Sequence, residues 1–234
     1  MADVSRETVP APDPTVAAEV CPPGRLSLLE RYAGLLANEG VVRGLIGPRE
    51  VPRLWDRHLL NCGLLAPLIP ERATVADLGS GAGLPGIVLG IVRPDLSVTL
   101  VEPMARRVAF LEEVRDELEL SHVDVVRARA EQWPRGRRFD VVTARALAAL
   151  PRLLAWGMPL VGDGGQLLAM KGSSAPVEIE TAADELARWG ARAEVVTSSV
   201  PGSSVTTVVR VVRDPGPAIG WRAASARRRR REHA

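Results

Sequence analysis

A glycine-rich turn between two apolar stretches is the segment best suited to bind a ligand. Residues 77–86 read Asp-Leu-Gly-Ser-Gly-Ala-Gly-Leu-Pro-Gly, after a predicted strand and before a predicted helix. Gly79, Gly81 and Gly83 let the backbone turn sharply and approach a ligand, because no Cβ stands in the way. With Gly86, the spacing satisfies GxGxxG, which fits a dinucleotide site as well as an S-adenosylmethionine site.

Two acidic residues separate these possibilities. Asp77 ends the first strand, where it can accept hydrogen bonds from the ammonium group of a methionine moiety or from its waters but would repel a pyrophosphate. Glu102 ends the second strand, and an acid there binds ribose hydroxyls in both classes of site. The loop therefore favours S-adenosylmethionine. An NAD-dependent oxidoreductase stays open as an alternative, although the sequence has no YxxxK pair to transfer protons.

The positions of the cysteines and the residues that follow the predicted strands exclude some types of methyl acceptor. Methylation of a pyrimidine at carbon 5 needs a cysteine nucleophile, but Cys21 and Cys62 both precede the loop. Exocyclic amine methylation usually shows an Asn or Asp, Pro, Pro, aromatic tetrad, where this chain has Thr-Ala-Arg-Ala at 143–146. A ring nitrogen such as guanine N7 remains among the candidates, because its lone pair needs no general base. In-line positioning alone can supply roughly 7 to 11 kcal/mol.

Basic side chains at two strand ends are the candidate catalytic residues. Arg145 ends a predicted central strand, where its planar fork can bind a phosphate or a base edge. Lys171 ends the next strand and is the one lysine among 30 basic residues. Arg49, Arg53 and Arg57 recur at every fourth position of a predicted helix. We expect Lys171 and this arginine stripe to contact RNA phosphates, with an ordinary solvated helix face as the alternative for the stripe.

The predicted strands and helices that position these residues alternate along the chain, which predicts an α/β fold. Helices are expected over 26–37 and 49–62, followed from Thr74 by alternating strands and helices, including one helix over 176–189 closed by Gly190. This rhythm predicts a mostly parallel sheet covered on both faces. The short connection at Pro201 makes the last two strands an antiparallel hairpin. The layout is that of a Rossmann-like class I methyltransferase with a seven-stranded sheet.

Composition sets the expected boundaries and the compartment. We divide the chain into a disordered leader (1–23), an N-terminal helical extension (24–70), the Rossmann-like domain (71–213) and a basic disordered tail (214–234). The cysteines have no metal-ligand spacing, so we expect neither a zinc site nor disulfides. The sequence has no run of 18 apolar residues and no secretory pattern, which favours a cytoplasmic protein with no membrane partner.

Several segments together resemble one family, the bacterial small-subunit ribosomal RNA methyltransferase G, also called glucose-inhibited division protein B. They are the stretch Trp55-Asp-Arg57-His58-Leu-Leu-Asn61, the loop LGSGAGLPG, Arg129-Ala130-Glu131, the VTARALA segment with Arg145, and Met170-Lys171-Gly172. The resemblance covers about residues 25–212. It implies methylation of guanine N7 in the decoding-region loop of 16S ribosomal RNA, with S-adenosylmethionine as donor and the small ribosomal subunit as partner.

The resemblance also implies cofactor contacts at Gly79, Leu84, Ala130, Glu131 and Arg145. Together with the loop and its two acids, the expected cofactor-binding residues are Asp77, Gly79, Ser80, Gly81, Gly83, Leu84, Glu102, Ala130, Glu131 and Arg145. We expect a monomer without a metal ion. A noncatalytic RNA-binding ribosome assembly factor that keeps the fold is the second alternative.

Overall fold

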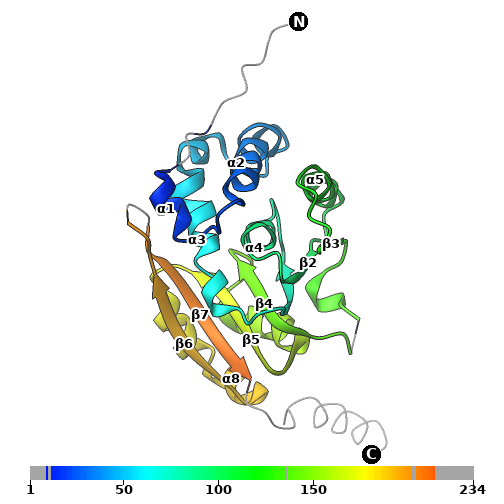
Figure 1. The fold of residues 1–234 in the computed structure, drawn as a ribbon. Helices are drawn as coiled ribbons and strands as arrows, with labels where there is room; N and C mark the ends of the chain where they lie inside the picture. The colour runs from blue at the N-terminus through cyan, green and yellow to red at the C-terminus, as the bar shows by residue number, and fades with distance from the viewer. Residues whose placement is uncertain (1–8, 10–11, 135, 202–203, 214–234) are drawn as a thin grey trace, which may run out of the picture.

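The structure is a computed structural model that describes residue 9 and residues 12–134, 136–201 and 204–213. In this part of the chain seven strands form one sheet with the order β3-β2-β1-β4-β5-β7-β6 (Figure 1). Strands β1 to β5 pair in parallel, whereas β7 runs antiparallel to β5 and β6. The predicted sheet is confirmed. Its strands are β1 (Thr74–Leu78), β2 (Ser97–Val101), β3 (Val123–Val126), β4 (Phe139–Arg145), β5 (Val161–Lys171), β6 (Ala191–Ser198) and β7 (Thr206–Arg213).

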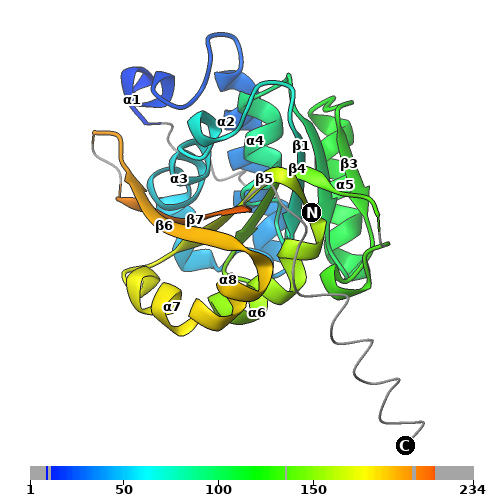
Figure 2. The same ribbon diagram turned by 90° about the horizontal axis from the view of Figure 1, so that it is seen from below.

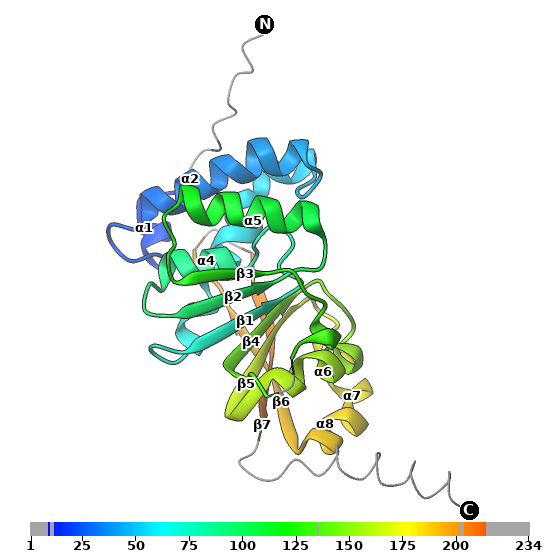
Figure 3. The same ribbon diagram turned by 90° about the vertical axis from the view of Figure 1, so that its right-hand side faces the viewer.

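Helices cover both faces of this sheet, as Figures 2 and 3 show from two directions. One face carries the N-terminal helices with α4 (Gly86–Val92) and α5 (Ala105–Glu117), and the other carries α6 (Leu150–Gly157), α7 (Ala175–Thr181) and α8 (Ala183–Trp189). Each face has its own apolar cluster. The central strands are apolar along their length because both of their faces are buried.

The register of the strands brings the predicted site residues to one edge. Leu78, at the end of β1, pairs with Val101 of β2 and Ala144 of β4, and Arg145 pairs with Met170 of β5. The carboxyl ends of these parallel strands therefore share one edge of the sheet, where ligands bind in open α/β sheets.

The helix predicted over 176–189 is two helices, α7 and α8, with Ala182 between them. Gly190 ends α8 with a φ of +57°, as predicted. The two short helices pack on β6 and β7, on the face opposite the N-terminal extension (Figure 3).

The N-terminal extension departs from a regular α-helix over 49–62. This segment is a 3-10 helix η2 (Pro48–Arg53), a π-helix η3 (Leu54–Leu59) and a turn of α-helix α3 (Leu60–Gly63). Pro52 lies inside η2, and a proline there has no N–H for an α-helical hydrogen bond. A spacing of four residues does not define one helix face through such changes of pitch. The first predicted helix is α2 (Leu26–Leu35), continued by a π-helical turn η1 (Leu36–Gly40).

Part of the expected leader is ordered, which corrects the boundary at residue 23. Helix α1 (Pro14–Ala18) is capped by Asp13, whose Oδ1 accepts the Thr15 N–H at 2.8 Å. Val20 and Cys21 are buried, and an added Cβ at Gly63 would lie 2.8 Å from Val20 Cβ. The apolar residues after Asp13 pack on α3, a long-range contact that composition does not reveal. The predicted tail, 214–234, lies outside the described residues. Within the described residues, no helix combines the length and apolar character needed to cross a bilayer.

Candidate functional site

The glycine turn lies at the carboxyl edge of the sheet, between β1 and α4. Gly79, Gly81 and Gly83 have φ angles of +66°, +60° and +98°, a region that residues with side chains rarely adopt. The Gly79 N–H donates to Val101 O at 2.8 Å, and the Gly83 N–H donates to Ser80 O at 2.7 Å. The predicted sharp turn is confirmed, and it rests against the end of β2.

Asp77 lies beneath the loop and not on its ligand-facing side. Its carboxylate is fully buried and accepts hydrogen bonds from Thr143 Oγ1 at 2.9 Å and from the Gly86 N–H at 3.2 Å. Burial raises the pKa of Asp77 to about 6, although these hydrogen bonds oppose the shift. In this geometry Asp77 ties β1 to β4 and to the start of α4. The contact of Asp77 with the ammonium group of a ligand, or with its waters, stays a prediction.

Glu102 extends from the end of β2 over the glycine turn. Its carboxylate accepts the Gly81 N–H at 3.0 Å and the Met104 N–H at 3.0 Å, and Arg107 Nη1 lies 3.6 Å away. The side chain is buried. A negative charge is therefore held at the N–H groups of the loop, which suits a cationic or hydroxyl-bearing ligand better than a phosphate.

Tyr32 connects the N-terminal extension to the loop. Its hydroxyl donates to Ala82 O at 2.7 Å, and an added Cβ at Gly83 would lie 2.8 Å from that hydroxyl oxygen. Tyr32 is fully buried and belongs to the core. Its second role, as a support for the loop, was not predicted, because the contact joins segments 50 residues apart.

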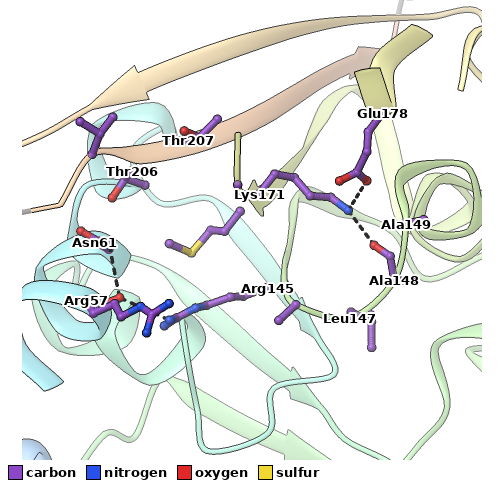
Figure 4. A pocket seen from close by; sticks show the side chains of 14 residues that line it. Arg57, Asn61, Arg145, Leu147, Ala148, Ala149, Lys171, Glu178, Thr206 and Thr207 are labelled. Carbon is purple, nitrogen blue, oxygen red and sulfur yellow. Dashed lines mark hydrogen bonds and ion pairs between the residues drawn. The ribbon is translucent and has the colours of Figure 1, made fainter. Parts of the chain in front are cut away.

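A cavity of about 610 Å³ opens beside the loop (Figure 4). Strand ends β4 and β5, the first residues of β7 and the N-terminal extension all contribute to it. Leu147 forms part of the wall and contacts the loop, since an added Cβ at Gly79 would lie 2.6 Å from Leu147 Cδ1. The polar residues that line the cavity include Arg57, Asn61, Arg145, Lys171, Glu178 and Thr206.

Arg145 points from the end of β4 toward the N-terminal extension. Its Nη2 donates to His58 Nδ1 at 2.5 Å and to the Arg57 main-chain oxygen at 3.3 Å, and its Nη1 approaches Cys62 Sγ at 3.5 Å. The prediction placed Arg145 at the mouth of the site, and the structure confirms that it lines the cavity. The contacts with the extension hold the guanidinium in one direction.

His58 joins Arg145 to Glu50. Because Nδ1 accepts from Arg145, the ring proton belongs on Nε2, which donates to Glu50 Oε2 at 2.9 Å. Burial and then the charge of Arg145 lower the pKa of His58, and the Glu50 contact opposes them only in part. His58 is therefore a hydrogen-bonded structural histidine. Glu50, eight positions earlier in the chain, was missed, because the η2 and η3 turns bring it to His58.

Lys171 is held on the opposite side of the cavity. Its Nζ lies 2.7 Å from Glu178 Oε2 and donates to Ala148 O at 2.6 Å. Glu178 also accepts the Leu150 N–H at 2.9 Å. Although burial opposes the shift, the hydrogen bonds from Lys171 and Leu150 lower the pKa of Glu178. Sequence reasoning missed Glu178, whose one signal is a carboxylate near the start of the helix that follows the strand-end lysine.

The arginine stripe is only partly associated with this cavity. Arg49, Arg53 and Arg57 are all exposed, but only Arg57 lines the cavity. Arg57 Nη1 lies 3.1 Å from Glu50 Oε1, so this arginine has an acidic partner that the sequence spacing concealed. The three residues do not lie along one face of a regular α-helix, because the pitch changes between them.

Ala130 and Glu131 lie elsewhere along the carboxyl side, in the short 3-10 helix η5 (Ala130–Gln132). They line a separate cavity of about 380 Å³ that also contains Trp133. Trp133 is buried, and its ring centroid lies 5.6 Å from that of Phe139, so its role here is packing. The structure thus gathers the loop and Glu102 in one place and Arg145 with Lys171 in the adjoining cavity, but sets Ala130 and Glu131 apart from both. Among the described residues, no group of three His, Cys, Asp or Glu side chains is arranged to hold a metal.

Comparison with known proteins identifies the family of the chain. The family model described as rRNA small subunit methyltransferase G matches residues 25–205. A ribosomal RNA small subunit methyltransferase G from Nocardioides sp. is 62% identical, over 97% of this chain and 91% of its own length. One from Thermobifida fusca is 54% identical, over 86% of each chain.

Solved structures add support for the fold alone. The ribosomal protein L11 methylase from Lactobacillus delbrueckii subsp. bulgaricus matches with a TM-score of 0.53 and 15% identity, over 68% of this chain and 79% of that one. TrmN from Thermus thermophilus has a TM-score of 0.53 and 17% identity, over 66% of this chain and 48% of that one. The family match spans most of the chain, including the glycine loop and the cavity, so the chain belongs to the rRNA small subunit methyltransferase G family.

Proposed function

We propose that this protein transfers a methyl group from S-adenosylmethionine to N7 of a guanine in the decoding-region loop of 16S ribosomal RNA. Membership of the family makes the chain an S-adenosylmethionine-dependent rRNA methyltransferase with a Rossmann-like fold. The guanine, its N7 and the loop of the RNA are the proposal. The observation that carries it is a cavity of about 610 Å³, large enough to admit a base, whose Leu147 wall contacts the glycine loop and whose titratable lining groups are all held by partners.

The residues around the loop fit S-adenosylmethionine. An added Cβ at Gly81 would meet no atom closer than Gly79 O at 3.7 Å, so this glycine faces open space that a ligand can enter. The Glu102 carboxylate can exchange its bond to Gly81 for ribose hydroxyls. A diphosphate at the same place would meet the Glu102 charge, which argues against the NAD-dependent alternative. Bound S-adenosylmethionine supplies an electrophilic methyl group on a sulfonium.

Other assignments of cofactor contacts follow from this placement. Gly79, Gly81, Gly83, Leu84 and Glu102 would hold the cofactor directly, with Ser80 shaping the turn through its main-chain bond to Gly83. Asp77 would support the loop from below, and Arg145 would reach the cofactor from the cavity side. Contacts from Ala130 and Glu131 rest on the family resemblance, and they require the cofactor to extend toward η5.

The chemistry of the cavity suits an acceptor that needs no general base. Burial raises the pKa of Cys62 to about 11, so its thiol stays protonated. Both ring nitrogens of His58 are engaged, and Lys171 is paired with Glu178. The in-plane lone pair of guanine N7 can attack a methyl group directly. The residues of the chain then act by holding the base in line with the methyl group, an effect worth roughly 7 to 11 kcal/mol.

RNA is bound in this proposal by cations around the cavity mouth. Arg57 is exposed at the rim, while Arg145 and Lys171 lie within. Arg49 and Arg53 are exposed on the same segment and extend the positive surface. We propose that the partner is the small ribosomal subunit, that the protein acts as a monomer without a metal ion, and that it works in the cytoplasm.

Methyl transfer to small ribosomal subunits tests the proposal. Subunits purified from cells that lack this enzyme are incubated with the protein and labelled S-adenosylmethionine, and 7-methylguanine is mapped in the RNA by chemical cleavage. We expect one labelled guanine in the decoding-region loop. Label at another atom or nucleotide contradicts the proposal. Binding of RNA without any transfer would instead favour the noncatalytic assembly factor.

A further inference from the structure

Two buried oxygens in the cavity are candidates for contacts with the substrate. Among the residues that the structure describes, Asn61 Oδ1 and Thr206 Oγ1 are buried side-chain atoms without a hydrogen-bond partner. Asn61 is 9% exposed and Thr206 is 3% exposed, and both line the cavity that contains Arg145 and Lys171. An unpartnered buried polar atom costs about 1 to 3 kcal/mol, so such atoms call for a physical reason.

The orientation of the Asn61 amide is fixed by its other half. Its Nδ2 donates to the Arg57 main-chain oxygen at 3.2 Å (Figure 4). Rotating the amide would place Oδ1 against that carbonyl oxygen, which is repulsive. Oδ1 is therefore the unpaired acceptor of a residue that lines the cavity. Thr206, at the start of β7, supplies a second oxygen from another element of the same wall.

Guanine carries the donors that such a wall would bind. Its N1–H and one N2–H of the amino group point in the same direction, so one carbonyl oxygen can accept from both. Adenine presents a lone pair at N1 and has no 2-amino group, so it would face Asn61 Oδ1 with an acceptor. A site built around a substrate hydrogen bond rejects an analogue that lacks the donor, because the buried partner then stays unpaired.

We propose that Asn61 Oδ1 reads the N1–H and N2–H edge of the substrate guanine, with Thr206 Oγ1 as a second acceptor at that edge. The inference rests on the proposed function. It leaves N7, on the other side of the purine, free to face the glycine loop. Methylation at N7 makes the ring cationic and its N1–H a stronger donor. A neutral acceptor at this edge therefore binds more tightly as the reaction proceeds, which favours the transition state over the ground state.

Replacing the 2-amino group of the substrate tests the contact. Small subunits are reconstituted with 16S RNA that carries guanine or inosine at the methylated position, because inosine keeps N7 and N1–H but lacks the amino group. We expect the wild-type protein to show a kcat/KM for guanine about 10- to 100-fold above that for inosine. In Asn61→Ala, kcat/KM for guanine falls by a similar factor and the ratio between the two bases approaches one. Thr206→Val lowers kcat/KM for guanine by a smaller factor.

Asn38→Ala is the matched control. Asn38 Nδ2 donates to Gly34 O at 2.7 Å, the same bond to the residue four positions earlier, but Asn38 does not line the cavity. We expect this variant to keep the wild-type ratio. The dissociation constant for S-adenosylmethionine and the thermal unfolding of Asn61→Ala should also match the wild type.

The possible failures are distinguishable. If the wild type transfers no methyl group to guanine N7, the proposed function is wrong. If it does, but Asn61→Ala keeps the wild-type preference for guanine, only the reading of the base by Asn61 is wrong. If Asn61→Ala does not fold, the wild-type measurement still decides, because equal rates on guanine and inosine contradict the contact.

Discussion

The polar groups of the glycine loop bond to the ends of the adjoining strands and to Tyr32 of the extension, whereas the adjoining cavity draws its lining side chains from several segments far apart in the sequence. In the loop, Asp77 and Glu102 accept hydrogen bonds from the backbone that they position. In the cavity, Arg145 reaches back 87 positions to His58, while Asn61 Oδ1 has no partner among the described residues. The two carboxylates of the loop are thus hydrogen-bonded without a substrate, whereas the cavity lining includes oxygens that have no hydrogen-bond partner among the described residues. Under the proposed function, this difference is the one expected between a site that always binds the same cofactor and a site that must select a base.

Arg145→Ala gives the largest expected loss. It removes the link between β4 and the extension and leaves His58 Nδ1 without its donor. We expect kcat/KM for methyl transfer to fall about 100-fold or more, because small misplacements of a reacting base are enough for that. Affinity for S-adenosylmethionine, measured by titration calorimetry, should fall far less. Wild-type turnover in this variant would remove Arg145 from the site.

The burial of Asp77 gives the loop a distinct pH dependence. The folded state holds the Asp77 proton up to a pH of about 6, against an ordinary value of 3.8. The folded state thus binds more protons in this window, so the free energy of unfolding falls as pH rises through it. We expect the wild type to lose about 2 kcal/mol relative to Asp77→Asn between pH 4 and pH 6.

Denaturant titrations of both proteins across this range measure the difference. The contribution of His58, beside the cavity, to the free energy of unfolding changes with pH in the opposite direction, because the pKa of His58 is lowered. Its contribution is fully present above the ordinary histidine pKa and is lost as pH falls below it. A constant difference between wild type and Asp77→Asn from pH 4 to pH 7 would contradict the burial of the carboxylate.

Gly79→Ala tests the contact between the two regions. The added methyl group would lie 2.6 Å from Leu147 Cδ1 at a φ of +66°, so loop and cavity wall must separate. We expect a loss of about 2 kcal/mol in the free energy of unfolding and weaker binding of S-adenosylmethionine. Gly164→Ala is the control, since its φ is +74° but no atom lies within 4 Å of the added methyl group. Equal cofactor affinities in the two variants would mean that Leu147 does not couple loop and cavity.

Lys171→Ala gives the smallest of these effects and separates two roles. The ammonium holds the segment 146–149 through Ala148 O, next to Ala146 with its strained φ of +51°. We expect transfer to fall about tenfold, the equivalent of one charged hydrogen bond. If Lys171 also contacts an RNA phosphate, the salt dependence of RNA binding decreases by about one unit of slope. An unchanged slope assigns Lys171 to positioning alone, and unchanged transfer contradicts both roles.

The fold and the loop could be predicted from the sequence because their signals are local. Gly79, Gly81 and Gly83 adopt the positive φ that their spacing indicated, and the short connection after β6 forms the expected hairpin. The sequence did not show the environment of a residue where distant segments form it. The position of Asp77 at a strand end was right, but its burial depends on Thr143 in the paired strand.

The cavity was predictable only in part. Arg145 and Lys171 were found because strand ends converge at one edge of a parallel sheet. Glu50 and Glu178 were missed. Glu50 reaches His58 through the irregular turns η2 and η3, and Glu178 reaches Lys171 from the helix that follows β5. The regular helix expected over 49–62 was wrong because Pro52 changes the pitch. Asn61 and Thr206 became notable only through unpaired oxygens, which no sequence pattern records.

The bond from Tyr32 to Ala82 makes the expected boundary at residue 70 a poor place to divide the chain. Residues of the extension, such as Leu29 and Leu36, share one apolar cluster with Ile87 and Leu111 of the sheet's helices. A protein shortened to begin at residue 71 would leave that cluster open to water and the Ala82 carbonyl without its donor. Residues 26–70 therefore share a hydrophobic core with the helices of the sheet, and we expect the two parts to unfold in a single cooperative step.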